Sequence, residues 1–140
     1  MKKTRKPILL SISGLVVLSI LCVWWFTMSI NSDFATEVLL RYYNGFGDNV
    51  SVTITDEDDI LILKQILNGR PYRESTACGF TTSVSITMTN GRKELVFCPA
   101  HDGCPLLRIG ASGRYISISD EANIELKAVL EKYGMIFPCV

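Results

Sequence analysis

The sequence predicts an α+β domain of two layers behind an N-terminal transmembrane helix, and three observations lead to this prediction. A run without any charge extends from Pro7 to Ile30. Two hairpin signals, Asn90-Gly91 and Ser112-Gly113, each lie between alternating apolar segments. Two amphipathic helical patterns begin near Asp56 and Ser119. Hairpins combined with such helices are typical of a mainly antiparallel sheet that carries two helices on one face.

The N-terminal run has the length and flanking charges of a membrane anchor. Residues 8–30 form a helix long enough to cross a hydrocarbon core of roughly 30 Å. The cations Lys2, Lys3, Arg5 and Lys6 precede it, and the positive-inside rule keeps such a cluster in the cytoplasm. The sequence therefore predicts a single-pass protein of the cell membrane with an extracellular C-terminal domain. We expect a cytoplasmic tail at 1–6, an anchor at 7–30, a spacer or edge strand at 31–49, and the domain at 50–140.

Two alternatives to a retained anchor remain open. A cleaved signal peptide would use Thr27-Met28-Ser29 as its cleavage site, although large apolar side chains crowd that position and the run is longer than an ordinary signal sequence. A lipoprotein would be modified at Cys22, although Leu21 stands where a small residue is needed.

Composition limits the partners of the exported part. The chain has 140 residues with 14 Lys and Arg against 14 Asp and Glu. Without the four leading cations, 10 basic residues face 14 acidic ones, so the exported part carries a net charge of −4. This balance and the lack of a basic stripe argue against nucleic acid and against anionic lipid headgroups as partners.

The first half of the exported part reads as two strands and a helix. Residues 37–43 are predicted as a strand, and residues 50–55 alternate strictly as a half-buried strand does. Thr55 or Asp56 would then cap a helix that ends at Gly69. Its predicted buried stripe consists of Ile60, Leu63, Ile66 and Leu67.

The second half reads as two hairpins and a second helix. The first hairpin joins residues 80–89 to 92–98, and a two-residue turn at each hairpin sets its register. The expected opposite pairs are Ile86 with Leu95, Val84 with Phe97, Ile109 with Ile116, and Leu107 with Ile118. A helix capped by Ser119 and ended by Gly134 follows. Its expected apolar side is formed by Ile124, Ala128, Val129 and Leu130.

Four cysteines in the exported part indicate two disulfides, because an even number in an oxidising compartment is typical of bridged domains. Spacing alone leaves three connectivities open. The register of the first hairpin, extended outward, brings Cys78 next to Cys104. This favours the pairs Cys78–Cys104 and Cys98–Cys139, although Pro99 weakens the extrapolation.

The same cysteines also allow a metal or thiol site. Residues 98–104 read Cys98-x-x-His101-x-x-Cys104, and Cys78 or Cys139 would complete a tetrahedral shell for zinc. A nucleophilic thiolate beside His101 is a further alternative, but it needs a reduced cysteine. The compartment favours disulfides over both alternatives, so no cofactor and no metal are expected.

The exported part resembles small membrane-anchored extracytoplasmic domains of Gram-positive bacteria. The segments that carry this resemblance are Thr53-Ile54-Thr55-Asp56, Cys78-Gly79-Phe80, Pro99-Ala100-His101-Asp102-Gly103-Cys104 and Tyr115-Ile116-Ser117-Ile118-Ser119. The resemblance implies an anchored accessory domain and assigns no catalytic residue.

Taken together, the patterns favour a binding or accessory module without catalytic activity, whose partner is an envelope component or a membrane protein. The alternatives are a zinc- or thiol-dependent site at Cys98, His101 and Cys104, and a structural subunit of a membrane complex that uses the anchor as its interface.

Overall fold

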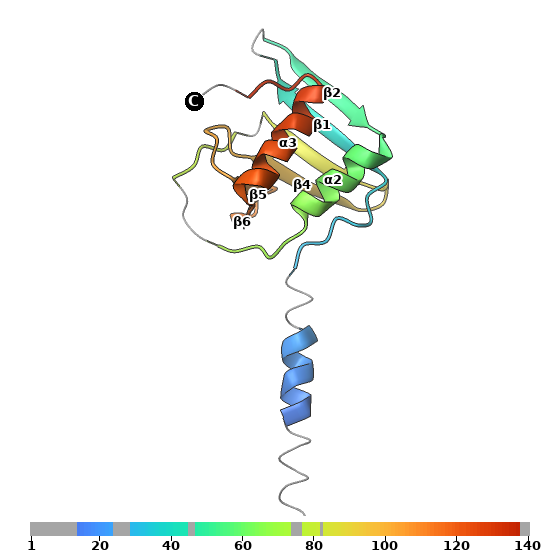
Figure 1. Ribbon diagram of the computed structural model, residues 1–140, viewed down its shortest axis with the longest axis vertical. Coiled ribbons are helices and arrows are strands. Elements are labelled where there is room, and N and C mark those ends of the chain that lie inside the picture. Colours follow the sequence, from blue (N-terminus) through green and yellow to red (C-terminus); the bar gives the residue numbers. More distant parts are fainter. Residues whose placement is uncertain (1–13, 24–28, 45–46, 74–76, 82, 138–140) are drawn as a thin grey trace, which may run out of the picture.

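The domain is built on one antiparallel sheet of six strands, shown in a computed structural model in Figure 1. The structure describes residues 14–23, 29–44, 47–73, 77–81 and 83–137. Neighbouring strands follow the order β2-β1-β3-β4-β5-β6. The elements are β1 (Glu37–Tyr43), β2 (Asn49–Ile54), α2 (Glu57–Leu67), β3 (Ser85–Thr89), β4 (Glu94–Pro99), β5 (Leu106–Ile109), β6 (Arg114–Ser117) and α3 (Asp120–Lys132).

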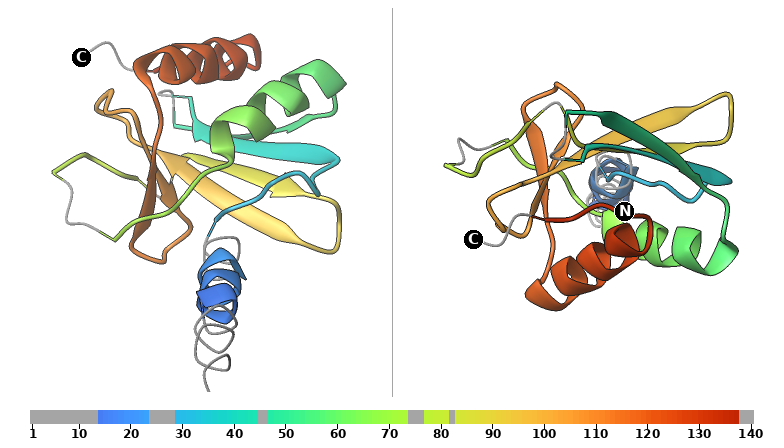
Figure 2. Two further views of the ribbon diagram at one scale, coloured as in Figure 1. Left: turned by 60° about the horizontal axis from the view of Figure 1, so that its bottom comes forward. Right: turned by 90° about the horizontal axis from the view of Figure 1, so that it is seen from above.

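Both helices lie on the same face of this sheet, as Figure 2 shows, so the predicted two-layer α+β class is confirmed. Alternate residues of every strand point into the space between the layers. The fully buried side chains include Leu40, Ile54, Ile86, Phe97 and Leu107 from the strands, and Leu63, Leu67, Leu126 and Leu130 from the helices. One apolar layer therefore holds the sheet and the helices together.

β1 occupies the interior of the sheet, which contradicts its prediction as a spacer or edge strand. It pairs with β2 on one side and with β3 on the other. Its side chains Val38 and Leu40 are completely buried. The fold also begins before residue 50, because Ile30 pairs with Gly69 and the side chain of Ser32 has no exposed surface.

Both hairpins form, but each register differs from its prediction by two residues. Ile86 lies opposite Phe97 and Leu107 opposite Ile116. The reason is the loop length, since residues 90–93 and 110–113 form four-residue loops. Asn90 Oδ1 closes the first loop by accepting from the amides of Arg92 and Lys93 at 3.0 and 2.9 Å. A shift by two leaves every side chain on its predicted face.

α2 begins as predicted and ends differently. Asp56 Oδ1 accepts from the amide of Asp59 at 3.1 Å, and the four predicted stripe residues are all buried. Asn68 is the C-terminal cap instead of Gly69. Gly69 instead exchanges backbone hydrogen bonds with Ile30 at 2.7 and 3.2 Å. A Cβ there would lie 3.2 Å from Ile116 Cγ2, so this close approach favours glycine.

α3 keeps its predicted caps but turns a different face inward. Ser119 Oγ accepts from the amide of Ala122 at 3.1 Å, and Gly134 ends the helix with φ of 87°. The buried residues are Leu126, Val129 and Leu130. Ile124 is 69% exposed and Ala128 is exposed, so the predicted apolar side was wrong at these two positions. The helix packs through its second half.

A buried carboxylate joins the two helices. Asp59 of α2 is only 6% exposed, and its Oδ2 accepts from Lys132 Nζ at 2.6 Å and from the Tyr133 hydroxyl at 2.5 Å. The hydrogen bond from Lys132 is the main cause that lowers the pKa of Asp59, and the bond from Tyr133 is the next. The hydrogen bond to Asp59 is also the main cause that raises the pKa of Tyr133 to about 12.

A further helix at residues 14–23 projects from the domain (Figure 1), and all ten of its residues are exposed. Within the described part of the chain, no helix reaches the length and apolarity that a membrane span requires. The predicted anchor at 7–30 lies partly outside the described residues and stays a prediction.

We expect Asp59→Asn in the full chain to lower the free energy of unfolding by about 1–3 kcal/mol at pH 7, because a buried acceptor of two hydrogen bonds loses its charge. Lys132 is 56% exposed, so the ion pair itself adds little. Urea unfolding followed by circular dichroism in detergent micelles measures the loss. The exposed Asp58→Asn is the matched control, and an equal loss there would contradict the assignment.

The pH dependence of this difference follows from three shifted pKa values, those of Asp59, Tyr133 and Lys132. Asp59 titrates below its ordinary value of 3.8, so its contribution is present above that pH and is lost as the pH falls through the lowered pKa. Tyr133 stabilises the fold fully below its ordinary value of 10.0, and this contribution is lost as the pH rises through about 12. The hydrogen bond to Asp59 is the main cause that raises the pKa of Lys132, so the contribution of Lys132 is also lost at high pH. Unfolding curves of wild type and Asp59→Asn should therefore converge at both extremes. If the free energies of unfolding of wild type and Asp59→Asn differed by the same amount at every pH, the charge of the Asp59 carboxylate would not contribute to stability.

Gly134→Ala should destabilise the fold more than Gly113→Ala. Both glycines have positive φ, 87° and 64°, which costs a residue with a Cβ about 1–2 kcal/mol. Only at Gly134 would the Cβ also meet a neighbour, the Tyr42 hydroxyl at 2.8 Å, whereas Gly113 faces open space. The same urea unfolding compares them, and equal losses would mean that the Tyr42 contact adjusts without cost.

Candidate functional site

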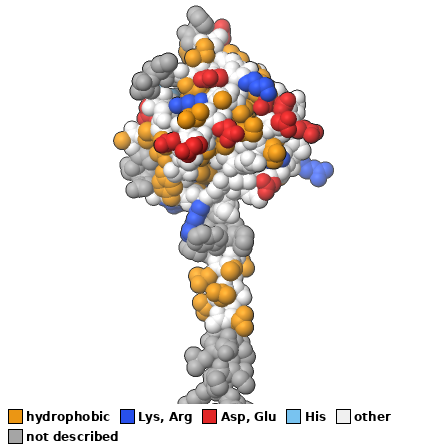
Figure 3. All heavy atoms as spheres, in the orientation of Figure 1, with side chains coloured by type: hydrophobic (Ala, Val, Ile, Leu, Met, Phe, Trp, Pro, Cys, Tyr) orange, Lys and Arg blue, Asp and Glu red, His pale blue; other side chains and the backbone are white. Residues whose placement is uncertain are grey.

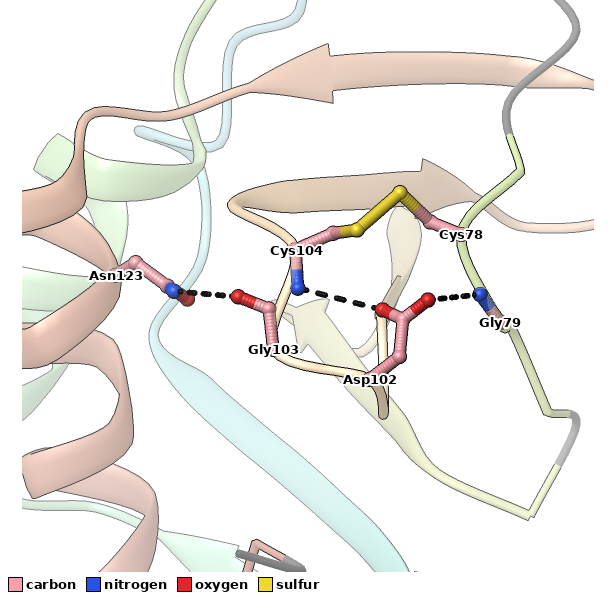
Figure 4. Close-up of a disulfide and its surroundings, with 6 residues drawn as sticks. All are labelled: Cys78, Gly79, Asp102, Gly103, Cys104 and Asn123. Carbon is pink, nitrogen blue, oxygen red and sulfur yellow. Dashed lines mark hydrogen bonds between the residues drawn. A yellow bond between two sulfur atoms is a disulfide. The ribbon is translucent and has the colours of Figure 1, made fainter. Parts of the chain in front are cut away.

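Chemistry-bearing side chains gather where the loop between β4 and β5 meets the segment 77–81 (Figure 4). A disulfide joins Cys78 to Cys104, with Cα atoms 6.3 Å apart. The predicted pairing of these two cysteines is therefore present. The segment 77–81 belongs to the long connection between α2 and β3.

The extrapolated ladder that suggested this disulfide explains it only in part. β3 begins at Ser85, so the predicted strand over residues 80–84 is absent in the described positions. In the observed register of this hairpin, position 78 would face position 105. A backbone hydrogen bond outside the ladder brings the two cysteine-bearing segments together, because the amide of His101 donates to the carbonyl of Gly79 at 3.0 Å. This contact lies beyond Pro99, where the regular ladder has ended.

Asp102 links the two sides of the disulfide. Its Oδ2 accepts from the amide of Gly79 at 2.6 Å, and its Oδ1 accepts from the amide of Cys104 at 3.3 Å. The bond from the Gly79 amide is the main cause that lowers the pKa of Asp102. Asn123 of α3 donates to the Gly103 carbonyl at 3.3 Å and ties the loop to the helix layer. The carboxylate therefore holds the cysteine-bearing segments together independently of the sulfur–sulfur bond.

The predicted site at Cys98, His101 and Cys104 is not the group that the structure assembles. Cys104 is in the disulfide. Cys98 forms no disulfide with any described residue, is 5% exposed, and lies on the face of β4 opposite to Phe97. The exposed His101 places its imidazole against Gly79, where an added Cβ would lie 2.9 Å from Nδ1. Among the described residues, the potential ligand atoms that lie within 4.8 Å of one another belong to Cys78, Asp102 and Cys104.

Asp102 was not among the site residues predicted from the sequence, so its role was missed. Its hydrogen bond to the amide two residues later is the Asx turn that this residue type favours. The bond to Gly79 is not local, and only the disulfide pairing could have suggested it. The second predicted disulfide, Cys98–Cys139, stays a prediction because Cys139 lies outside the described residues.

An aromatic group covers the adjoining edge of the sheet. Tyr72 pairs with Tyr115 of β6 through two backbone hydrogen bonds of 3.0 Å. The ring of Phe80 lies 5.3 Å from that of Tyr115, and the Arg108 guanidinium lies 5.5 Å above the Phe80 ring. These contacts fix both ends of the segment that carries Cys78 against β5 and β6.

No protein-family model matches the chain, and the searches of curated proteins and of solved structures also found no match. The interpretation of the site therefore depends on its own geometry.

Reduction of Cys78–Cys104 should lower the free energy of unfolding by about 3–4 kcal/mol, because the bridge closes a loop over a sequence separation of 26 residues. Urea unfolding of the oxidised and the reduced full chain measures this difference. Cys78→Ser should show the same loss without reductant, and Cys22→Ser should show none. A loss below about 1 kcal/mol would mean that the bridge does not constrain the unfolded chain.

Alkylation of the denatured, unreduced chain counts the bridges. Of the five cysteines, Cys22, Cys98 and Cys139 should react if Cys78–Cys104 is the single disulfide. Only Cys22 should react if Cys98–Cys139 forms as well. Intact mass after alkylation distinguishes the two states, and five reacting thiols would contradict both.

Proposed function

We propose that the chain is a membrane-anchored extracytoplasmic accessory or binding module without catalytic activity of its own. Its partner would be an envelope component or another membrane protein. The observation that carries the proposal is the exposed apolar surface of the helix at residues 14–23, and the disulfide supports the compartment.

The N-terminal helix exposes apolar side chains that water does not favour. Its large hydrophobic residues are between 52% and 66% exposed, and they are Leu15, Val16, Val17, Leu18, Ile20, Leu21 and Val23. The described core of the domain draws on residues from Ala35 onward and does not include them. An exposed patch of this kind marks a surface for lipid or for another protein. The uncharged run on both sides of it, from Pro7 to Ile30, favours lipid.

The polar side chain in this helix is also suited to a bilayer. The Ser19 hydroxyl donates to the Leu15 carbonyl at 2.8 Å, one turn back along the helix. This bond satisfies the hydroxyl within the helix, so its burial in hydrocarbon costs less.

The cysteine chemistry supports a location of the domain outside the cytoplasm. Disulfides persist in oxidising compartments and are rare where thiol reductants are abundant. The Cys78–Cys104 bridge, which holds the connection between α2 and β3, would persist in such an environment. With the N-terminal cations held in the cytoplasm, export of residues beyond the anchor satisfies both requirements.

The surface charge of the domain favours a protein or envelope partner over a polyanion. Figure 3 shows Asp and Glu side chains gathered over the layer of α2 and α3. The first turns of these helices contribute Glu57, Asp58, Asp120 and Glu121. This acidic face would repel nucleic acid and anionic headgroups.

Surface labelling of intact cells tests the proposal on the native chain. A membrane-impermeant amine reagent should modify Lys93, an exposed residue of the domain, and should leave Lys2, Lys3 and Lys6 unmodified. Permeabilised cells are the control and should show label at both places. Peptide mapping of the carbonate-washed membrane fraction gives the readout and also shows whether the N-terminal peptide is retained.

Two results would contradict the proposal. Label on the N-terminal lysines of intact cells with a protected Lys93 would reverse the topology. Recovery of the chain in the carbonate supernatant would show that it is not anchored in the membrane. The binding role is tested separately by cross-linking on the same cells, where the absence of any adduct would oppose it.

A further inference from the structure

The disulfide region has the donor set of a metal site once its cysteines are reduced. We propose that Cys78, Asp102 and Cys104 bind one zinc ion in the dithiol state, so that the same three residues hold either a disulfide or a metal. This inference does not depend on the anchor or on the binding role proposed above.

The first argument is proximity. One ligand atom from each residue lies within 4.8 Å of the other two, and all three residues are only partly buried, so an ion can enter. Zinc–sulfur bonds of about 2.3 Å in a tetrahedron separate two sulfurs by roughly 3.8 Å. The Cα separation of 6.3 Å allows this separation through side-chain rotation. Two thiolates and one carboxylate leave a fourth position for water or another ligand, as in sites that exchange ligands.

The second argument is that the arrangement is held without the sulfur–sulfur bond. The amide of His101 binds the Gly79 carbonyl, and Asp102 binds the Gly79 amide, so two hydrogen bonds keep the neighbour of Cys78 beside the loop that carries Cys104. Asn123 of α3 fixes that loop from its other side. After reduction, these hydrogen bonds therefore keep the thiols of Cys78 and Cys104 side by side, and the two segments do not separate.

The third argument is the state of Asp102. Each of its oxygens accepts one backbone hydrogen bond, and a carboxylate has about four acceptor positions, so lone pairs remain for a cation. The cited hydrogen bonds orient it as second-sphere partners orient the ligands of known metal sites.

The chemistry balances with a dithiol as reductant. A protein or small-molecule dithiol attacks the Cys78–Cys104 bond, takes over the disulfide, and leaves two thiols on this chain. Zinc then binds two thiolates and releases two protons to water. In the reverse exchange, a partner disulfide accepts the two electrons and becomes a dithiol, Cys78–Cys104 forms again, and the zinc ion should be expelled.

The test uses the full chain in detergent micelles, reduced with a phosphine under anaerobic conditions. Zinc is titrated against a chromophoric chelator, and cobalt(II) serves as a spectroscopic probe for thiolate ligands. The reduced chain should bind one zinc, show a thiolate-to-cobalt charge-transfer band, and lose both properties after reoxidation. Cys78→Ser should abolish the band, and Asp102→Asn should weaken zinc binding about tenfold or more.

The matched control is Cys98→Ser, which removes the buried Cys98 thiol of the reduced chain and should bind zinc like the wild type. Disulfide formation in oxidised Asp102→Asn, read from intact mass, shows that the loop of this variant is still in place. Three results would overturn the proposal: no zinc on the reduced wild type, unchanged binding in Cys78→Ser, or loss of binding in Cys98→Ser. The last would place the metal at Cys98 instead.

Discussion

Burial of one face of the sheet beneath α2 and α3 is the interaction on which the rest of the structure depends. Phe97, near the middle of the six strands, is fully buried, and so are Leu63 of α2 and Leu130 of α3. At about 25 cal/mol per Å² of apolar surface, this layer is the largest favourable contribution to folding. The layer also decides where polar groups can lie. Asp59 enters it only because Lys132 and Tyr133 both donate to the same carboxylate oxygen.

The sequence predicted the layer well because its evidence is periodic. The alternation over 50–55 and the stripe from Ile60 to Leu67 each identify a buried face without knowledge of any partner. Errors arose where a contact distant in sequence decides the outcome. β1 became an interior strand because β3 pairs with it, and a chain of alternating residues does not reveal how many neighbours it has. The exposure of Ile124 has the same origin, since the buried residues of α3, Leu126, Val129 and Leu130, all lie in its second half.

The candidate site shows a similar division. The pairing of Cys78 with Cys104 was predictable from an approximate register, because the predicted and the observed registers both place Cys104 one residue from the position opposite Cys78. The role of Asp102 in the site was not predictable from the sequence, because its hydrogen bond with the Gly79 amide depends on the path of the chain after Pro99. The pattern Cys98-x-x-His101-x-x-Cys104 pointed to a different ligand set. That set is not assembled, because Cys98 lies within β4 whereas His101 and Cys104 lie in the loop that follows, where Cys104 is bridged to Cys78.

The path of the chain between α2 and β3 explains why a staple is needed at Cys78. The chain leaves α2 at Leu67, passes Tyr115 on the far edge of the sheet, and returns to begin β3 at Ser85 beside β1. Such a long irregular connection loses about 1–2 kcal/mol of backbone entropy for each residue that is ordered. A covalent link near its turning point confines the unfolded segment as well as the folded one. A zinc ion held by the same two sulfurs would also confine this segment. The segment would then stay ordered in both redox states, while the site changes from a disulfide to a metal site.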